Sequence, residues 1–312
     1  MSFRLFVYYC ALCGGWAAFL GWLFGRLPAY PNEIARDGIR GLFLGTLVAL
    51  GLSLVDCLWN LSLRQAGQIL LRVGVAVVVG SVGGMIGAML GSVFYHKVVR
   101  SFVFVIFGWT VTGLLVGASV GVFEVLSSLV RQKDLSGSRR KIVNGTLGGT
   151  VGGILGGVLF VLLNTVWVGL FQGKDENELW SPSSLGFVAL GLCIGLLIGL
   201  AQVIFKEAWI KVESGFRAGR EKILAKGEFT IGRAESCDIG LFGDNTIERL
   251  HARILKRGND FFLMDAGTPG GTFLNGRQVL RPELLHSGDT IKVGNSVLRF
   301  GERQKRKQYQ GI

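Results

Sequence analysis

The chain has 312 residues, of which 50% are hydrophobic and only 17% are charged, with 48 glycines and 5 prolines. About a quarter of the residues in a soluble domain are charged, so this balance excludes an ordinary soluble protein and favours membrane helices. The net charge of +12 is spread along the chain, and the segment 216–301 is almost balanced, which argues against a nucleic-acid-binding protein.

Six hydrophobic runs occupy the first two thirds of the chain, and we expect each to form a transmembrane helix. About 20 apolar residues in a helix cross a hydrocarbon layer of about 30 Å. No clear cleavage site follows the first run, which we interpret as an uncleaved span. The runs cover about residues 5–24, 39–58, 73–93, 102–123, 142–171 and 185–205.

The loops between these runs predict the orientation of the chain. If the N-terminus is inside, the inner segments carry thirteen Lys and Arg residues and the outer segments carry six. Positive residues accumulate on the cytoplasmic side of membrane proteins. We therefore expect a multi-pass protein of the cell (inner) membrane, surrounded by the lipid bilayer, with both termini in the cytoplasm.

Glycines recur at intervals of four residues within the hydrophobic runs. Gly145, Gly149, Gly153 and Gly157 form one such stripe, and three other runs repeat the spacing. This spacing keeps small residues on one helix face, so that two backbones can approach closely, as in a glycine zipper. The stripes predict packing within one chain or between copies in a homo-oligomer. A phosphate-binding loop is the competing interpretation of 145–157, but its G-K-[ST] sequence is absent.

Few ionisable residues fall within the runs, which favours a helical anchor. Arg72 and Glu124 are expected at span ends, where their side chains reach the interface, whereas Asp56 lies near the end of the second span. A relay or substrate site would need several such groups facing one another. A transporter or channel regulated by the C-terminal part is the alternative.

Catalytic and metal-binding patterns are missing from the sequence. Cys10 and Cys13 form a C-x-x-C within an apolar run, and we interpret them as small packing residues. We find no nucleophile–base pairing, metal-ligand cluster or P-loop. The sequence therefore predicts a protein that is not an enzyme and has no cofactor.

After Lys206 the pattern changes to short alternating segments separated by turns rich in Gly, Asn and Asp. Many short strands at this spacing predict a β-sandwich, and Gly294-Asn295 predicts a tight hairpin turn. The predicted organisation is a membrane domain over 1–206, a linker over 207–219, an all-β domain over 220–301 and a basic tail over 302–312. The tail is interpreted either as a contact with anionic lipid or as a solvated charge run.

Four ordered motifs then carry a family resemblance. "IGRAESCDIGL", "RLHARI", "GTPGGTFLNGRQV" and "LLHSGDTIKVGNSVLRF" together resemble a forkhead-associated (FHA) domain. The Gly-rich part before them is similar to the membrane region that precedes FHA domains in some bacterial proteins. The resemblance implies an 11-stranded sandwich whose loops at one end bind phosphothreonine peptides.

The same resemblance implies roles for individual residues. Arg233, Arg249 and Thr272 match positions that bind a phosphopeptide. A guanidinium suits phosphate because it carries a permanent charge and several donors. Residues implied to be structural in the binding loops are Gly232, His251, Asn275 and Gly276.

Two binding positions depart from the family pattern. Glu248 stands where a serine usually bonds the phosphate, and Gly270 stands where an asparagine usually holds the peptide. A carboxylate repels a phosphate, so these departures argue against carrying the binding activity over unchanged. One hypothesis is that Glu248 pairs with Arg233 and makes a surface for a non-phosphorylated partner. The sequence thus predicts a membrane-anchored signalling or scaffold module with a protein partner, threonine-phosphorylated or not.

Overall fold

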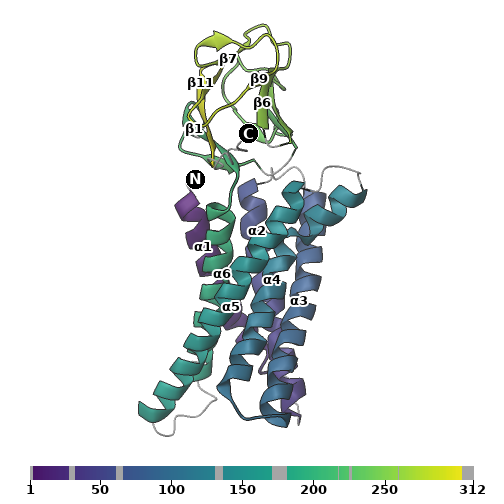
Figure 1. Cartoon of the computed structure of the whole chain (residues 1–312), viewed down its shortest axis with the longest axis vertical. Coiled ribbons are helices and arrows are strands. Elements are labelled where there is room, and N and C mark those ends of the chain that lie inside the picture. Colours follow the sequence, from purple (N-terminus) through teal and green to yellow (C-terminus); the bar gives the residue numbers. More distant parts are fainter. Residues whose placement is uncertain are drawn as a thin grey trace, which may run out of the picture. The chain divides into compact units, whose positions relative to one another are not determined.

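Figure 1 shows the computed structural model of the chain, in which α-helices come first in the sequence and β-strands follow. The structure describes residues 3–27, 32–60, 66–130, 136–170, 181–216, 218–224, 227–258 and 260–303. Within these ranges the chain forms six helices and eleven strands. It divides into a helical unit, which ends at Phe205, and a β unit, which begins at Lys206.

All six predicted helices are present and are long and apolar enough, by length and composition, to cross a membrane. Several extend beyond the predicted runs, because hydropathy marks only the apolar part of a helix and the polar turns at its ends remain helical. The helices are α1 (Phe3–Phe24), α2 (Glu33–Asn60), α3 (Ala66–Lys97), α4 (Phe102–Val130), α5 (Ser136–Leu170) and α6 (Pro182–Ile204).

Glycines lie where neighbouring helices approach most closely. A Cβ atom on Gly117 of α4 would clash with the carbonyl oxygen of Gly145 of α5, and one on Gly149 would clash with that of Gly113. A second stripe on α5 faces the backbone of α6 in the same way; it consists of Gly148, Gly152 and Gly156. Both stripes of α5 therefore pack within one chain, and these contacts give no support to the homo-oligomer that the spacing also allowed.

Adding a methyl group at one of these contacts should destabilise the helical unit. We expect Gly117→Ala to cost about 1–3 kcal/mol, because the α4 and α5 backbones must separate to admit the Cβ atom. Gly74→Ala in α3 is the matched control, because a Cβ there would meet no atom within 4 Å. It should be neutral or stabilise by about 0.5–1 kcal/mol. Unfolding of both variants in detergent checks this, and equal losses would contradict it.

A buried ionic cluster joins three helices. The carboxylate of Asp56 on α2 lies 2.9 Å from Arg72 of α3 and 2.6 Å from Lys141 of α5, and these side chains are only 6–9% exposed. The amide of Gln202 donates to the carbonyl oxygen of Lys141 at 3.2 Å, which brings α6 to the same place. The expectation that Arg72 reaches the interface is wrong, because Asp56 supplies a counter-charge inside the unit. The side chain of Glu124 lies outside the described residues.

The β unit is a sandwich of two sheets with its own hydrophobic core, as the sequence predicted. One sheet has the strand order β2-β1-β11-β10-β7-β8 and the other β4-β3-β5-β6-β9. The two-residue hairpin at Gly294-Asn295 is also present between β10 and β11. The strands are β1 (Ala208–Ser214), β2 (Glu221–Ile223), β3 (Glu228–Gly232), β4 (Ile239–Gly240), β5 (Ala252–Arg257), β6 (Asp260–Asp265), β7 (Thr272–Leu274), β8 (Arg277–Gln278), β9 (Glu283–Leu284), β10 (Thr290–Val293) and β11 (Ser296–Glu302).

The segment 207–219 is not a linker. It contains β1, which lies between β2 and β11 in its sheet, with Ala208, Ile210 and Val212 buried at alternate positions. This period of two places one face of the strand in the core. The first strand of the β unit therefore begins twelve residues before the predicted boundary at 220. Of the predicted tail, residues 304–312 lie outside the described residues.

Candidate functional site

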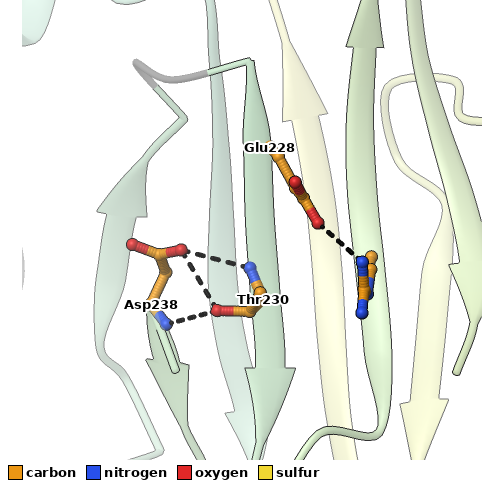
Figure 2. A network of polar contacts seen from close by, with 4 residues as sticks. Glu228, Thr230 and Asp238 are labelled. Carbon is orange, nitrogen blue, oxygen red and sulfur yellow. Dashed lines mark hydrogen bonds and ion pairs between the residues drawn. The ribbon is translucent and has the colours of Figure 1, made fainter. Parts of the chain in front are cut away.

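The loop that carries Arg233 leaves β3 and is closed at its base by two side chains. Thr230 and Asp238 form three hydrogen bonds, of 3.0, 3.2 and 3.2 Å, which join β3 to the parallel strand β4 (Figure 2). Glu228 at the start of β3 accepts a hydrogen bond of 3.1 Å from Arg253 of β5 (Figure 2). The loop over 233–238 therefore starts and ends at fixed positions.

A second loop, over 241–251, lies directly against the end of β3. The backbone N–H of Arg233 donates to the carbonyl oxygen of Glu248 at 2.8 Å, and that of Ala234 donates to Arg249 at 3.0 Å. Gly232 permits this approach, because a Cβ atom there would clash with the carbonyl oxygen of Arg249. The two loops are thus joined backbone to backbone, without any contribution from the Glu248 side chain.

His251 connects this second loop to a third, over 266–271. Its ring is fully buried, and Nδ1 accepts a hydrogen bond of 3.1 Å from the backbone N–H of Glu248. The proton must then lie on Nε2, which donates to the carbonyl oxygen of Gly271 at 3.1 Å and approaches the Thr268 hydroxyl at 3.2 Å. Both ring nitrogens are therefore occupied within the protein, and the ring holds two loops together.

Asp265 organises the third loop. It accepts hydrogen bonds from the hydroxyls of Thr272 and Thr268, at 2.6 and 2.9 Å, and from the backbone N–H groups of Gly267 and Thr268. Burial raises the pKa of the Asp265 carboxyl, but these hydrogen bonds outweigh it and hold the pKa below its ordinary value. Thr272, expected among the peptide-binding residues, is fully buried. Its side chain braces Asp265 and is not on the loop surface.

Asp244 connects the second loop to the β10–β11 turn. Its carboxylate accepts from the hydroxyl and backbone N–H of Thr246 and from the N–H of Asn295, which lies 2.8 Å away. Hydrogen bonds from Thr246, and then from Asn295, lower the pKa of Asp244. Neither Asp244 nor Asp265 was expected among the site residues from the sequence. Each lies two residues before a backbone N–H that it bonds, which is the pattern of an Asx-turn.

The expected ion pair between Glu248 and Arg233 does not form. The guanidinium of Arg233 instead donates to the amide oxygen of Asn245 at 3.1 Å. Glu248 and Arg249 are both exposed, and neither side chain has an ion pair or hydrogen bond with another described residue. The surface of the second loop therefore carries one carboxylate and one guanidinium that can both meet a ligand.

The other expected positions lie in tight turns. Asn275 and Gly276 have φ angles of 50° and 83° and form the two-residue turn between β7 and β8. Both positive values are those of a type I′ hairpin. The Asn275 side chain donates to Asp289 and accepts from the N–H of Thr290. At Gly270 a Cβ atom would find its nearest neighbours at 3.7 and 4.0 Å, so a side chain has room there.

Comparison with known proteins agrees with this architecture. The family model for the FHA domain matches residues 229–294. A relative named glycogen accumulation regulator GarA, from Mycobacterium tuberculosis, is 31% identical over 132 residues, which are 42% of this chain and 76% of that protein. The FHA domain-containing protein FhaB of the same organism is 26% identical over 142 residues, 45% of this chain and 91% of FhaB.

Solved structures of FHA domains are also similar to this chain. One, from a study of phosphothreonine-dependent FHA domain interactions, is 26% identical and covers 32% of this chain and 100% of its own, with a TM-score of 0.29. The relatives at 31% identity, together with the family model, identify the β unit. The chain belongs to the family of FHA domain proteins.

Proposed function

We propose that this protein is a membrane-anchored docking module whose FHA domain binds a threonine-phosphorylated protein segment at the loops around Arg233. The observation that carries this proposal is the partner of Arg233: its partly exposed guanidinium donates to Asn245 and is not neutralised by Glu248. A guanidinium with donors to spare can bind phosphate through two parallel hydrogen bonds. Arg249 adds an exposed cation on the neighbouring loop.

The rigidity of the loops supports binding, whereas Glu248 limits it. His251 and Asp265 hold the second and third loops in place before any ligand arrives, which lowers the ordering cost of association. Glu248 places a negative charge beside the proposed phosphate position, and the two like charges repel. The domain therefore binds phosphothreonine more weakly than one with a serine at this position.

The helical unit supports an anchoring role in the cell membrane. Its six apolar helices and the excess of Lys and Arg in the segments before α1, between α2 and α3, between α4 and α5, and after α6 favour cytoplasmic termini. The ionisable residues Asp56, Arg72 and Lys141 bind one another. This mutual pairing favours a structural anchor over a transporter or channel. The relatives, which include a regulator, favour an interaction module over an enzyme.

Titration of the β unit with phosphothreonine peptides tests the proposal. A fragment over 206–303 contains both sheets and the whole of their core, so it is expected to fold alone. It should bind a degenerate phosphothreonine peptide library, and not the unphosphorylated library. Arg233→Ala should weaken binding at least about tenfold, because a hydrogen bond to a charged group contributes about 1.5–3 kcal/mol.

The control is Arg281→Ala, which removes another exposed arginine at a distance in sequence from all three loops. It should leave the affinity unchanged. Equal binding of phosphorylated and unphosphorylated libraries, or equal losses in the two arginine variants, would show that the surface around Arg233 is not a phosphate site.

A further inference from the structure

The helical unit contains a cavity of about 210 Å³ that no part of the proposed docking function uses. Its lining comes from the N-terminal halves of α2, α4 and α6 and from the C-terminal halves of α3 and α5. These parts of the helices lie in the half of the unit that is remote from Ile204, where α6 ends. In the proposed topology this half faces away from the cytoplasm. Residues that line it include Asp37, Arg40, Ser92, Trp109, Phe160 and Phe187.

Aromatic rings form the apolar part of this cavity. The ring of Trp109 lies 5.2 Å from that of Phe187, edge to face, and 5.7 Å from that of Phe160. Trp109 is only 8% exposed, and its Nε1–H is buried without an acceptor among the described residues. A buried donor of this kind costs free energy unless an acceptor meets it. The cavity wall therefore suits a ligand that has both a ring and an oxygen acceptor.

Two opposite charges lie on one face of α2 at the same cavity. Asp37 and Arg40 are three residues apart and both line it. The hydroxyl of Ser92 donates to the Asp37 carboxylate at 2.8 Å, which orients that carboxylate. A carboxylate and a guanidinium on adjacent turns complement a small ligand that carries an ammonium and a carboxylate together.

We propose that this cavity binds a free α-amino acid with an aromatic side chain. The ligand ring packs on Trp109, Phe160 and Phe187, and its carboxylate accepts from the donors of Arg40 and Trp109. Its ammonium lies against Asp37. The volume agrees with this assignment, because an apolar cavity of about 150 Å³ holds benzene and 210 Å³ leaves room for a short polar head.

The test uses the full chain in lipid nanodiscs and three probes that share one ring. L-Phenylalanine carries both head groups, 3-phenylpropionate lacks the ammonium, and 2-phenylethylamine lacks the carboxylate. We expect saturable binding of phenylalanine by calorimetry, with each one-headed probe at least about tenfold weaker. The proposal is overturned if phenylalanine shows no saturable binding, if either one-headed probe binds as tightly, or if a co-purified phospholipid fills the cavity and phenylalanine does not displace it.

Two conservative variants test whether phenylalanine binds in this cavity. Trp109→Phe keeps the ring and removes the N–H, so it should weaken phenylalanine about tenfold. Asp37→Asn still accepts from Ser92, and it should weaken phenylalanine about tenfold while leaving 3-phenylpropionate unchanged, which a merely structural role would not do. Trp16→Phe is the control, because Trp16 is 66% exposed on α1. Affinities that do not change in either cavity variant, or that fall equally in the Trp16 control, place the ligand elsewhere.

Discussion

Glu248→Ser is expected to tighten the binding of a phosphothreonine peptide to the FHA domain by about two orders of magnitude. The substitution removes a carboxylate beside the phosphate, where repulsion costs about 1–4 kcal/mol near a surface. It also supplies a hydroxyl that can donate to the phosphate, and a bond of this kind contributes about 1.5–3 kcal/mol. A factor of ten in affinity corresponds to about 1.4 kcal/mol, so even the lower ends of these ranges give a large change.

The loop should keep its shape in this variant. Only the backbone of Glu248 takes part in the loop contacts, through its N–H to His251 and its carbonyl oxygen to Arg233. Glu248→Gln separates the two contributions, because it removes the charge without providing a hydroxyl of the right reach. Isothermal titration of the 206–303 fragment should rank serine above glutamine and glutamine above the native glutamate. If all three bind equally, the phosphate does not lie beside residue 248.

Gly270, the second position that departs from the family pattern, can be tested in the same 206–303 fragment. Gly270 has space for a side chain and no positive φ, so Gly270→Asn should add a peptide contact without strain. Gly271 differs, because its φ is +61° and a Cβ there would lie 2.5 Å from the amide nitrogen of Gln278. Gly270→Ala is the matched control that adds a side chain but no amide. A gain with asparagine alone would assign a peptide contact to this position.

The sequence predicted the helices and most strands because their signals are local. An apolar run of about 20 residues and an alternation between turns can each be seen without knowing any distant contact. β1 was missed because it directly follows the apolar helix α6 and has an apolar face of its own, so it resembled a continuation of that helix. Its pairing with β2 and with β11, which is far away in the sequence, distinguishes it as a strand.

Contacts between the loops could not be predicted from the sequence either, because they join residues that are far apart along the chain. The family resemblance gave His251 a bracing position, but not the tautomer, which depends on the Glu248 N–H and the Gly271 carbonyl. It placed Thr272 on the binding surface, whereas the side chain of Thr272 is buried and its hydroxyl donates to the carboxylate of Asp265. It also did not predict the orientation of the Arg233 side chain, which in the structure donates a hydrogen bond to Asn245.

Asp56→Ala is expected to destabilise the helical unit by about 3–5 kcal/mol, which is more than any surface substitution should cost. The carboxylate of Asp56 is 2.9 Å from Arg72 and 2.6 Å from Lys141. Its removal takes the Asp56 counter-charge away from two buried cations. When one partner of a buried ion pair is removed, the other charge stays buried without compensation, and this strongly destabilises the folded state. Unfolding in mixed detergent, followed by tryptophan fluorescence, measures the loss.

Two further variants separate charge burial from lost packing. Glu33→Ala removes a carboxylate that is 58% exposed and lies 3.0 Å from His96, so it should cost less than about 1 kcal/mol. The triple variant Asp56→Leu, Arg72→Met and Lys141→Met replaces the cluster with apolar side chains of similar volume. Such replacements are often neutral or stabilising by about 1–4 kcal/mol, so the triple variant should be more stable than Asp56→Ala. A triple variant as unstable as Asp56→Ala would mean that the cluster contributes through its geometry, by setting the positions of α2, α3 and α5, and not through the balance of its charges.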